Sequence, residues 1–187
     1  CVMEEARNFT IFGKGITMKK LIFMFLILTM GTGALAVTVI WPQQPARSWD
    51  DPNAVWELSP GKTYFPPGIG DYVYILSTNE VTVDSAVNIK RLFIDRAVTG
   101  YPTVASTITV APGGELTVNS ICQLGHGIDG GTINISGGNM IMSNAAGDRT
   151  GTYSLLMDDN YASILNITAG TLSIQNGSEF EFSSGSQ

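Results

Sequence analysis

The chain has 187 residues, of which 44% are hydrophobic and 14% are charged. That length and apolar content supply a sizeable core and exclude an intrinsically disordered chain. The 21 glycines and the low charge favour short strands and tight turns. Residues 37–187 hold 6 Lys plus Arg against 14 Asp plus Glu, a net charge of −8 that disfavours nucleic acid and anionic membrane surfaces as partners.

Residues 18–36 have the pattern of a signal peptide. Lys19 and Lys20 precede an apolar run of ten residues, 21–30, and a small-x-small cleavage sequence ends at Ala36. The run is too short for a membrane-spanning helix, which needs about 20 residues. We therefore expect cleavage near Ala36, a mature chain without a transmembrane span, and a location that is secreted or on the outer cell surface.

Residues 1–17 match no pattern and begin at Cys1 rather than at a methionine. Met18 makes the better start, so we interpret 1–17 as an upstream leader; the alternative is a long n-region of the signal peptide that starts at Met3. Cys122 is then the only cysteine of the exported chain. Because no intrachain disulfide can form, burial and backbone hydrogen bonds must hold the domain together.

Residues 37–79 differ in composition from residues 80–187, and we interpret them as an N-terminal cap region. All three tryptophans lie there, together with six of the eight prolines, which prevent a long helix. The first convincing strand is 71–76.

The aromatic residues of this region have two interpretations. They could cover the open end of a solenoid, which every such fold must cap, and this is the interpretation we favour. They could also be platforms that stack on sugar rings. The candidate stacking residues are Trp49, Trp56, Tyr72 and Tyr74.

The sequence from 80 to 187 is repetitive. Segments 107–118, 132–142 and 164–174 each contain an apolar-x-apolar strand, a Gly-bearing turn and a second apolar-x-apolar strand. Such a motif, recurring every 20 to 50 residues, is typical of a solenoid. Stacked coils would place equivalent apolar residues in inward columns. The predicted columns are Val110, Ile135 and Ile167, and Leu116, Met140 and Leu172.

Two further features are expected of such coils. The glycines of the turn permit left-handed backbone at the corners, and asparagines just past the second strand could stack. These residues are Gly113, Gly138 and Gly170, and Asn119, Asn144 and Asn176. The longer second spacing predicts a loop that bulges outward within 144–161.

The predicted fold is therefore all-β: a right-handed parallel β-helix, or β-solenoid, over 80–187 with an aromatic-rich N-terminal cap. The alternative is a β-sandwich, whose strands also recur at short intervals. We favour the β-helix because a sandwich has no reason to repeat one turn sequence.

Four motifs carry a resemblance to a known group of proteins. They are 49–56 with a Trp at each end, Pro-Gly-Ile-Gly-Asp-Tyr-Val-Tyr-Ile at 67–75, Val-Thr-Val-Asp at 81–84, and Gly-Thr-Ile-Asn-Ile-Ser-Gly-Gly at 131–138. Over 49–182 the chain resembles secreted bacterial β-helix repeat proteins of the autotransporter or PEP-CTERM type. The resemblance implies a longer protein, so we expect this chain to be a fragment truncated within the solenoid, with other coils of the same protein as a partner.

Loop carboxylates are the candidate metal ligands. Calcium takes several oxygen ligands, and loops on stacked coils can supply them. The candidates are Asp129, Asp148, Asp158 and Asp159. A solvated acidic loop is the simpler interpretation, because no nonapeptide calcium repeat is present. No other cofactor is expected.

No residue pair makes a convincing catalytic site. Cys122 and His126 lack a third group to orient them. Glu179 and Glu181 could be a glycosidase pair, but on a strand they form an outward face opposite two phenylalanines.

These observations favour a non-enzymatic extracellular or cell-surface β-helix with a structural or adhesive role. The alternatives are a polysaccharide lyase or hydrolase, and a carbohydrate-binding module on the same scaffold. The lyase would use the one charged cluster on a strand-like segment, Lys90 and Arg91 with Asp95 and Arg96. The expected partners are polysaccharides or cell-surface components.

Overall fold

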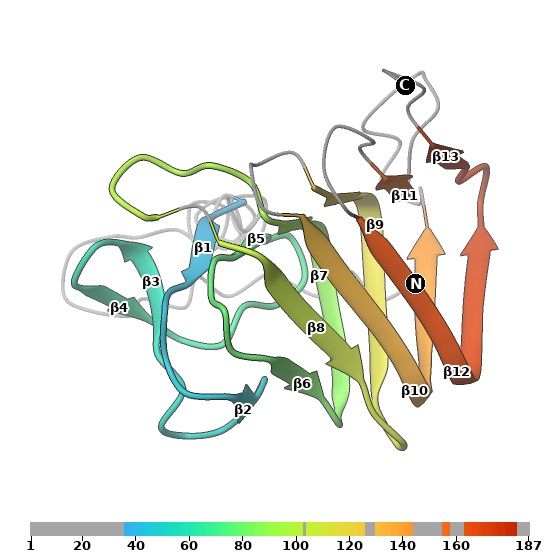
Figure 1. Ribbon diagram of the computed structural model, residues 1–187, viewed down its shortest axis with the longest axis horizontal. Helices are drawn as coiled ribbons and strands as arrows, with labels where there is room; N and C mark the ends of the chain where they lie inside the picture. Colours follow the sequence, from blue (N-terminus) through green and yellow to red (C-terminus); the bar gives the residue numbers. More distant parts are fainter. Residues whose placement is uncertain (1–35, 103, 126–129, 144–154, 158–162, 183–187) are drawn as a thin grey trace, which may run out of the picture. The chain divides into compact units, whose positions relative to one another are not determined.

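The computed structural model describes residues 36–102, 104–125, 130–143, 155–157 and 163–182. Within these ranges the protein is all-β, with no helix and 59% of the residues in strands, which confirms the predicted class (Figure 1). Consequently no helix in the described ranges is long and apolar enough to cross a membrane. The predicted leader and all of the signal peptide except Ala36 lie outside the described residues.

The described strands form a single curled sheet with mixed pairing. They are β1 (Thr38–Trp41), β2 (Arg47–Ser48), β3 (Trp56–Ser59), β4 (Lys62–Tyr64), β5 (Tyr72–Ile75), β6 (Val81–Val83), β7 (Ala86–Ile94), β8 (Ser106–Val110), β9 (Glu115–Leu124), β10 (Gly131–Ser143), β11 (Leu155–Met157), β12 (Ile164–Gln175) and β13 (Phe180–Phe182). All pairings are parallel except those of β3 with β1 and β4.

Parallel pairing arranges all of these strands except β3 and β4 in three stacks. Stack A contains β2, β6, β8, 131–135 of β10 and 164–167 of β12. Stack B contains 86–89 of β7, 115–118 of β9, 139–143 of β10 and 171–175 of β12. Stack C contains β1, β5, 91–94 of β7, 121–124 of β9, β11 and β13.

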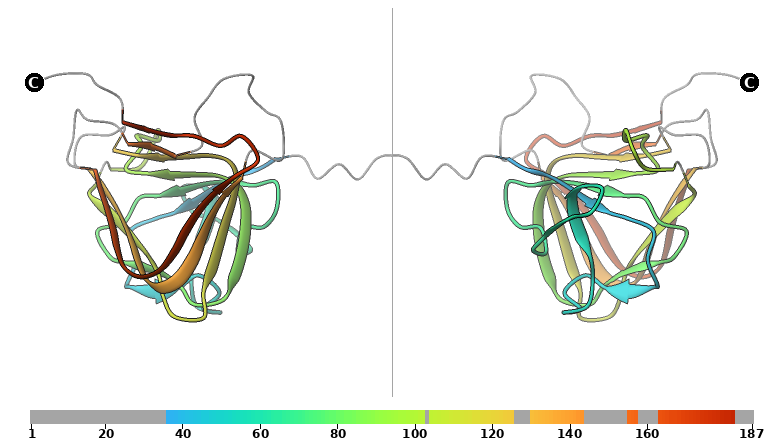
Figure 2. Two further views of the ribbon diagram at one scale, coloured as in Figure 1. Left: turned by 90° about the vertical axis from the view of Figure 1, so that its right-hand side faces the viewer. Right: turned by 90° about the vertical axis from the view of Figure 1, so that its left-hand side faces the viewer.

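The chain visits these stacks in a fixed order. From β5 onward each turn supplies a strand to C, then A, then B. The first turn supplies β1 to C and β2 to A, and then departs into the β3–β4 hairpin. In Figure 2 the strands curl around a shared interior.

Alternation along each strand explains what fills that interior. In β10, Ile133, Ile135, Met140 and Met142 are buried while most residues between them are partly exposed. Successive side chains of a strand point to opposite faces, so a period of two buries one apolar set per strand. Apolar residues at the matching positions of every turn therefore form one continuous core.

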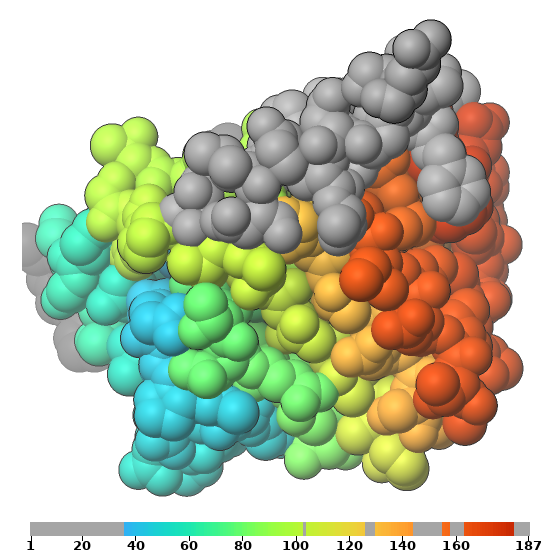
Figure 3. All heavy atoms as spheres, in the orientation of Figure 1, coloured from blue at the N-terminus to red at the C-terminus, as the bar shows by residue number. Residues whose placement is uncertain are grey.

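Both predicted columns have the expected register. Ile135 pairs with Val110 on one side and Ile167 on the other, and Met140 likewise lies between Leu116 and Leu172. Ile167 differs from its partners because 50% of it is exposed. It belongs to β12, beyond which no further strand of stacks A and B lies among the described residues (Figure 3, orange to red side).

The corner glycines have two different roles. Gly113 (φ 87°) and Gly170 (φ 89°) adopt the predicted left-handed backbone. The prediction is wrong for Gly138, because the left-handed residue of that turn is Gly137 (φ 136°). Gly138 is instead required by close approach, since a Cβ there would lie 2.6 Å from the Gly114 carbonyl oxygen of the preceding turn.

Polar ladders run along the outer faces of the stacks. Asn166 Nδ2 donates to Asn134 Oδ1 at 3.0 Å in stack A, and Thr171 Oγ1 donates to Asn139 Oδ1 at 2.7 Å in stack B. The stacking predicted for Asn119, Asn144 and Asn176 is not observed as such: Asn119 donates to Asn88, Asn176 donates to Ser143 Oγ at 2.9 Å, and Asn144 lies outside the described residues.

The loop predicted within 144–161 falls mostly outside the described residues. Its described part, β11, pairs with β9 and β13 in stack C. The outward loop stays a prediction for the rest of 144–161, which lies outside the described residues.

Candidate functional site

The outward side of stack C carries aromatic and basic residues in register. Tyr72 pairs with Arg91, and Tyr74 pairs with Phe93. These residues alternate with the buried Val73, Ile75, Leu92 and Ile94, so their side chains point away from the core.

Cations lie over two of these rings. Arg91 Cζ is 4.6 Å from the centroid of the Tyr72 ring, and Lys90 Nζ is 5.8 Å from it. Arg96 Cζ is 4.5 Å from the centroid of Phe93. A cation within about 6 Å of a ring face is attracted by the ring quadrupole.

The rings themselves also pack together. Tyr74 and Phe93 stack with centroids 4.6 Å apart and an interplanar angle of 27°. Phe93 is 3% exposed as a result, whereas Tyr72 and Tyr74 are half-buried. We call Tyr72, Tyr74, Lys90, Arg91, Phe93 and Arg96 together the Tyr72 face.

A bulge in β7 positions Lys90 and Arg91, two of the three cations. The pairing of β7 with β9 shifts register between Ile89 and Arg91. Both Lys90 N and Arg91 N donate to the Asp71 carbonyl oxygen, at 3.0 and 3.2 Å. This bend carries β7 from stack B into stack C, and such bulges commonly redirect side chains.

The structure separates the four predicted stacking residues into two groups. Trp49 and Trp56 are 2% and 1% exposed and pack together with Trp41, with ring centroids 4.6 and 4.7 Å from the Trp56 ring. Trp56 Nε1 also donates to the Trp49 carbonyl oxygen at 3.4 Å. Both indoles are therefore buried in this cluster. The cap interpretation and sugar stacking by the four residues both stay predictions.

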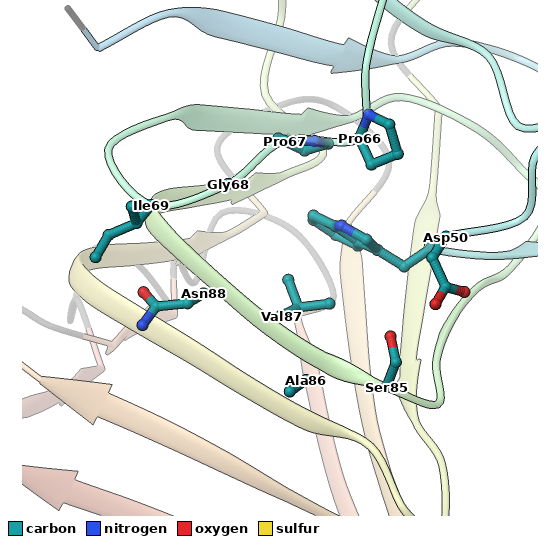
Figure 4. Close-up of a pocket in the computed structure, with 10 residues that line it drawn as sticks. Asp50, Pro66, Pro67, Gly68, Ile69, Ser85, Ala86, Val87 and Asn88 are labelled. Carbon is teal, nitrogen blue, oxygen red and sulfur yellow. The ribbon is translucent and has the colours of Figure 1, made fainter. Parts of the chain in front are cut away.

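A groove lies beside stack B, between residues 66–69 and residues 85–88 (Figure 4). Its volume is about 620 Å³, within the range of about 300–1,000 Å³ that ligand pockets occupy. It is lined by Trp49, Asp50, Pro66, Pro67, Gly68, Ile69, Ser85, Ala86, Val87 and Asn88.

The predicted calcium ligands Asp129, Asp148, Asp158 and Asp159 all lie outside the described residues. Among the residues that are described, no three His, Cys, Asp or Glu side chains come together to hold a metal. The calcium prediction therefore stays a prediction.

The two candidate catalytic pairs have different environments. Cys122 is fully buried in stack C, and burial raises the pKa of its thiol well above the ordinary value. A neutral buried thiol is not a nucleophile, and His126 lies outside the described residues. Glu179 is exposed and Glu181 half-buried at the last described strand of stack C.

Sequence reasoning missed Phe93 as a member of the Tyr72 face, and it named Lys90, Arg91 and Arg96 as a charged cluster without placing them beside the two tyrosines. Tyr74 and Phe93 are only 19 residues apart, shorter than the spacings that define the repeat, so the repeat pattern did not align them. The run Tyr-Val-Tyr-Ile at 72–75 against Arg-Leu-Phe-Ile at 91–94 is the signal that could have found them.

Taken together, fold and site define an all-β protein with three stacks of parallel strands and an aromatic, basic outer face. Comparison of the chain with protein-family models, with curated proteins and with solved structures finds no match.

Proposed function

We propose that the chain is an exported, non-enzymatic surface protein built as a right-handed parallel β-helix, which serves a structural or adhesive role by holding acidic polysaccharide on the Tyr72 face. The observation that carries the adhesive role is the placement of three cations against ring faces on one outward surface.

The β-helix is supported by the parallel pairing and by the fixed order in which the chain visits stacks C, A and B. A right-handed turn is supported by the strong preference for right-handed connections between parallel strands of one sheet. Export is supported by the signal-peptide pattern of 18–36. The exposure of Ile164, Ile167 and Ile174 on β12 supports another coil as the partner of that strand.

The charge of the Tyr72 face supports an acidic ligand. Lys90, Arg91 and Arg96 are half of the six basic residues in 37–187, although that stretch as a whole is acidic. Half-buried tyrosines beside them offer apolar ring area for the less polar face of a sugar, and the cations would meet its carboxylates.

Affinity electrophoresis of the full chain tests this proposal. We expect migration to be retarded in a gel that contains polygalacturonate and not in one that contains dextran. Tyr72→Ala should weaken binding about fivefold, equivalent to about 1 kcal/mol, because it removes the ring that Arg91 and Lys90 contact. Phe65→Ala is the matched control, since Phe65 is 81% exposed and lies outside the face.

Size-exclusion chromatography of the polymer after incubation separates adhesion from catalysis. Retardation with an unchanged polymer length supports adhesion. Shortening of the polymer would support the lyase or hydrolase instead, and equal migration in both gels would contradict the adhesive role.

A further inference from the structure

Stack B lacks a strand from the first turn of the chain. Every later turn contributes one, beginning with 86–89 of β7. The first turn leaves stack A at Ser48, and the chain enters the β3–β4 hairpin instead. Segment 86–89 therefore pairs with β9 along one edge, and no described strand pairs with its other edge.

The backbone direction of β7 shows which groups face that open edge. Glu115 N donates to the Ser85 carbonyl oxygen at 3.0 Å, so Ser85 and the alternate residue Val87 turn their backbone groups toward β9. Ala86 and Asn88 turn theirs the other way. Among the described residues, β9 is the only strand that pairs with 86–89, and no bond outside the strands involves the backbone N–H or C=O of Ala86 or Asn88.

The groove occupies the space beside this edge. Val87 lies along it, and Pro66 and Pro67 lie across from the strand (Figure 4). Because prolines have no N–H group, Pro66 and Pro67 cannot donate hydrogen bonds to the carbonyl oxygens of Ala86 and Asn88. The two prolines therefore line the far side of the groove without pairing with the open edge of 86–89.

The charge of the groove is acidic. Asp50 is the only charged residue among the described residues that line it, and Ser48 Oγ lies within hydrogen-bonding distance of both Asp50 Oδ1, at 3.0 Å, and Asp84. The neighbouring Asp51 is paired with Arg47 at 2.9 Å. A basic side chain on a ligand would complement Asp50 and Asp84.

We propose that this groove binds an extended peptide segment, which adds a strand beside 86–89 and occupies the missing position of stack B. An extended backbone presents donors and acceptors at the two-residue spacing of Ala86 and Asn88, about 6.6 Å. An apolar side chain of the peptide packs against Ile69, which lines the groove and is 72% exposed, and a basic residue lies near Asp50.

The inference goes beyond the proposed polysaccharide adhesion and does not depend on it. The groove borders stack B, whereas the Tyr72 face lies on stack C. Loss of polysaccharide binding would leave peptide binding intact, and the converse holds as well.

Fluorescence anisotropy on the full chain tests the proposal with a labelled peptide, acetyl-Lys-Val-Thr-Val-Thr-amide. Two control peptides carry N-methyl groups on alternate amides. One peptide is methylated on the odd-numbered residues and the other on the even-numbered residues. We expect the parent peptide to bind and one methylated peptide to bind at least about tenfold more weakly, because only one set of amides can face β7. The peptide that is methylated on the other set of amides should bind as the parent peptide does.

A matched pair of variants gives a second readout. Asn88→Pro removes the groove-facing N–H and should weaken binding at least about tenfold, whereas Asn88→Ala keeps this N–H and should bind as the parent does. If Asn88→Pro fails to fold by circular dichroism, the methylated peptides still decide. The proposal is overturned if the parent peptide does not bind at millimolar concentration or if both methylated peptides bind equally. Displacement of the peptide by cellohexaose would also overturn it, in favour of a glycan site.

Discussion

Replacing Trp56 with alanine is expected to lower the free energy of unfolding by about 3–5 kcal/mol. Trp56 is 1% exposed, and its ring contacts both Trp41 and Trp49. Truncation leaves a cavity between two indoles and removes the hydrogen bond from Nε1 to the Trp49 carbonyl oxygen. Because this cluster closes the first turn of the stacks, the surrounding backbone has little freedom to collapse into the space.

Urea denaturation followed by circular dichroism measures this loss. Phe65→Ala is the control, because it removes another aromatic side chain of the same region that is 81% exposed. The control should change the free energy of unfolding by no more than about 0.5 kcal/mol. Equal stability of the two variants would show that the tryptophans do not form a structural cap, and would favour sugar stacking as the role of Trp49 and Trp56.

Adding a single methyl group at Gly138 is expected to destabilise the protein by about 3 kcal/mol. The Cβ of Gly138→Ala would lie 2.6 Å from the Gly114 carbonyl oxygen and 2.7 Å from Val110 Cγ1, and would also collide with the Ala111 carbonyl oxygen. Backbone of the preceding turn cannot move aside as a flexible side chain could. The same close approach repeats at Gly170, whose Cβ would meet the Gly138 carbonyl oxygen.

Gly68→Ala is the matched control for this substitution. No heavy atom lies within 4 Å of a Cβ at Gly68, and its φ lies outside the left-handed region. Alanine there should be neutral or stabilise by up to about 1 kcal/mol, because it restricts the unfolded chain. A thermal melt of both variants compares the two effects, and a Gly138→Ala protein as stable as Gly68→Ala would contradict the close stacking of successive turns.

The repeat could be predicted from sequence because two patterns occur in it together: apolar residues alternate along each strand, and the same turn recurs between the strands. Alternation within 107–118, 132–142 and 164–174 identifies the strands, and their common turn aligns them, which predicts the partners of Ile135 and Met140. The position of Ile167 in its column was predictable in the same way. Its exposure was not, because exposure depends on what stacks beyond β12.

The first turns were harder to predict because their spacing is irregular. Stack C aligns Tyr72 with Thr38 across 34 residues and with Arg91 across 19, and the second interval is shorter than those of the later turns, which are 30, 33 and 25 residues in this stack. The Tyr72 face and the groove both arise from this irregularity. The groove in particular depends on a strand that the first turn does not supply, and no local pattern marks such an omission.

Disulfide formation in the Asn134→Cys/Asn166→Cys variant tests the stacked, parallel arrangement most directly. Asn134 and Asn166 are paired residues on neighbouring strands of stack A, with their side-chain amides 3.0 Å apart, and paired positions are close enough for a disulfide. Cys122 should not compete, because it is buried and its pKa is raised. We expect rapid intrachain cross-linking on mild oxidation, detected by mass spectrometry, and none in Asn88→Cys/Asn134→Cys, whose residues lie in different stacks. Absence of the 134–166 cross-link in folded protein, or equal cross-linking of both pairs, would contradict the arrangement.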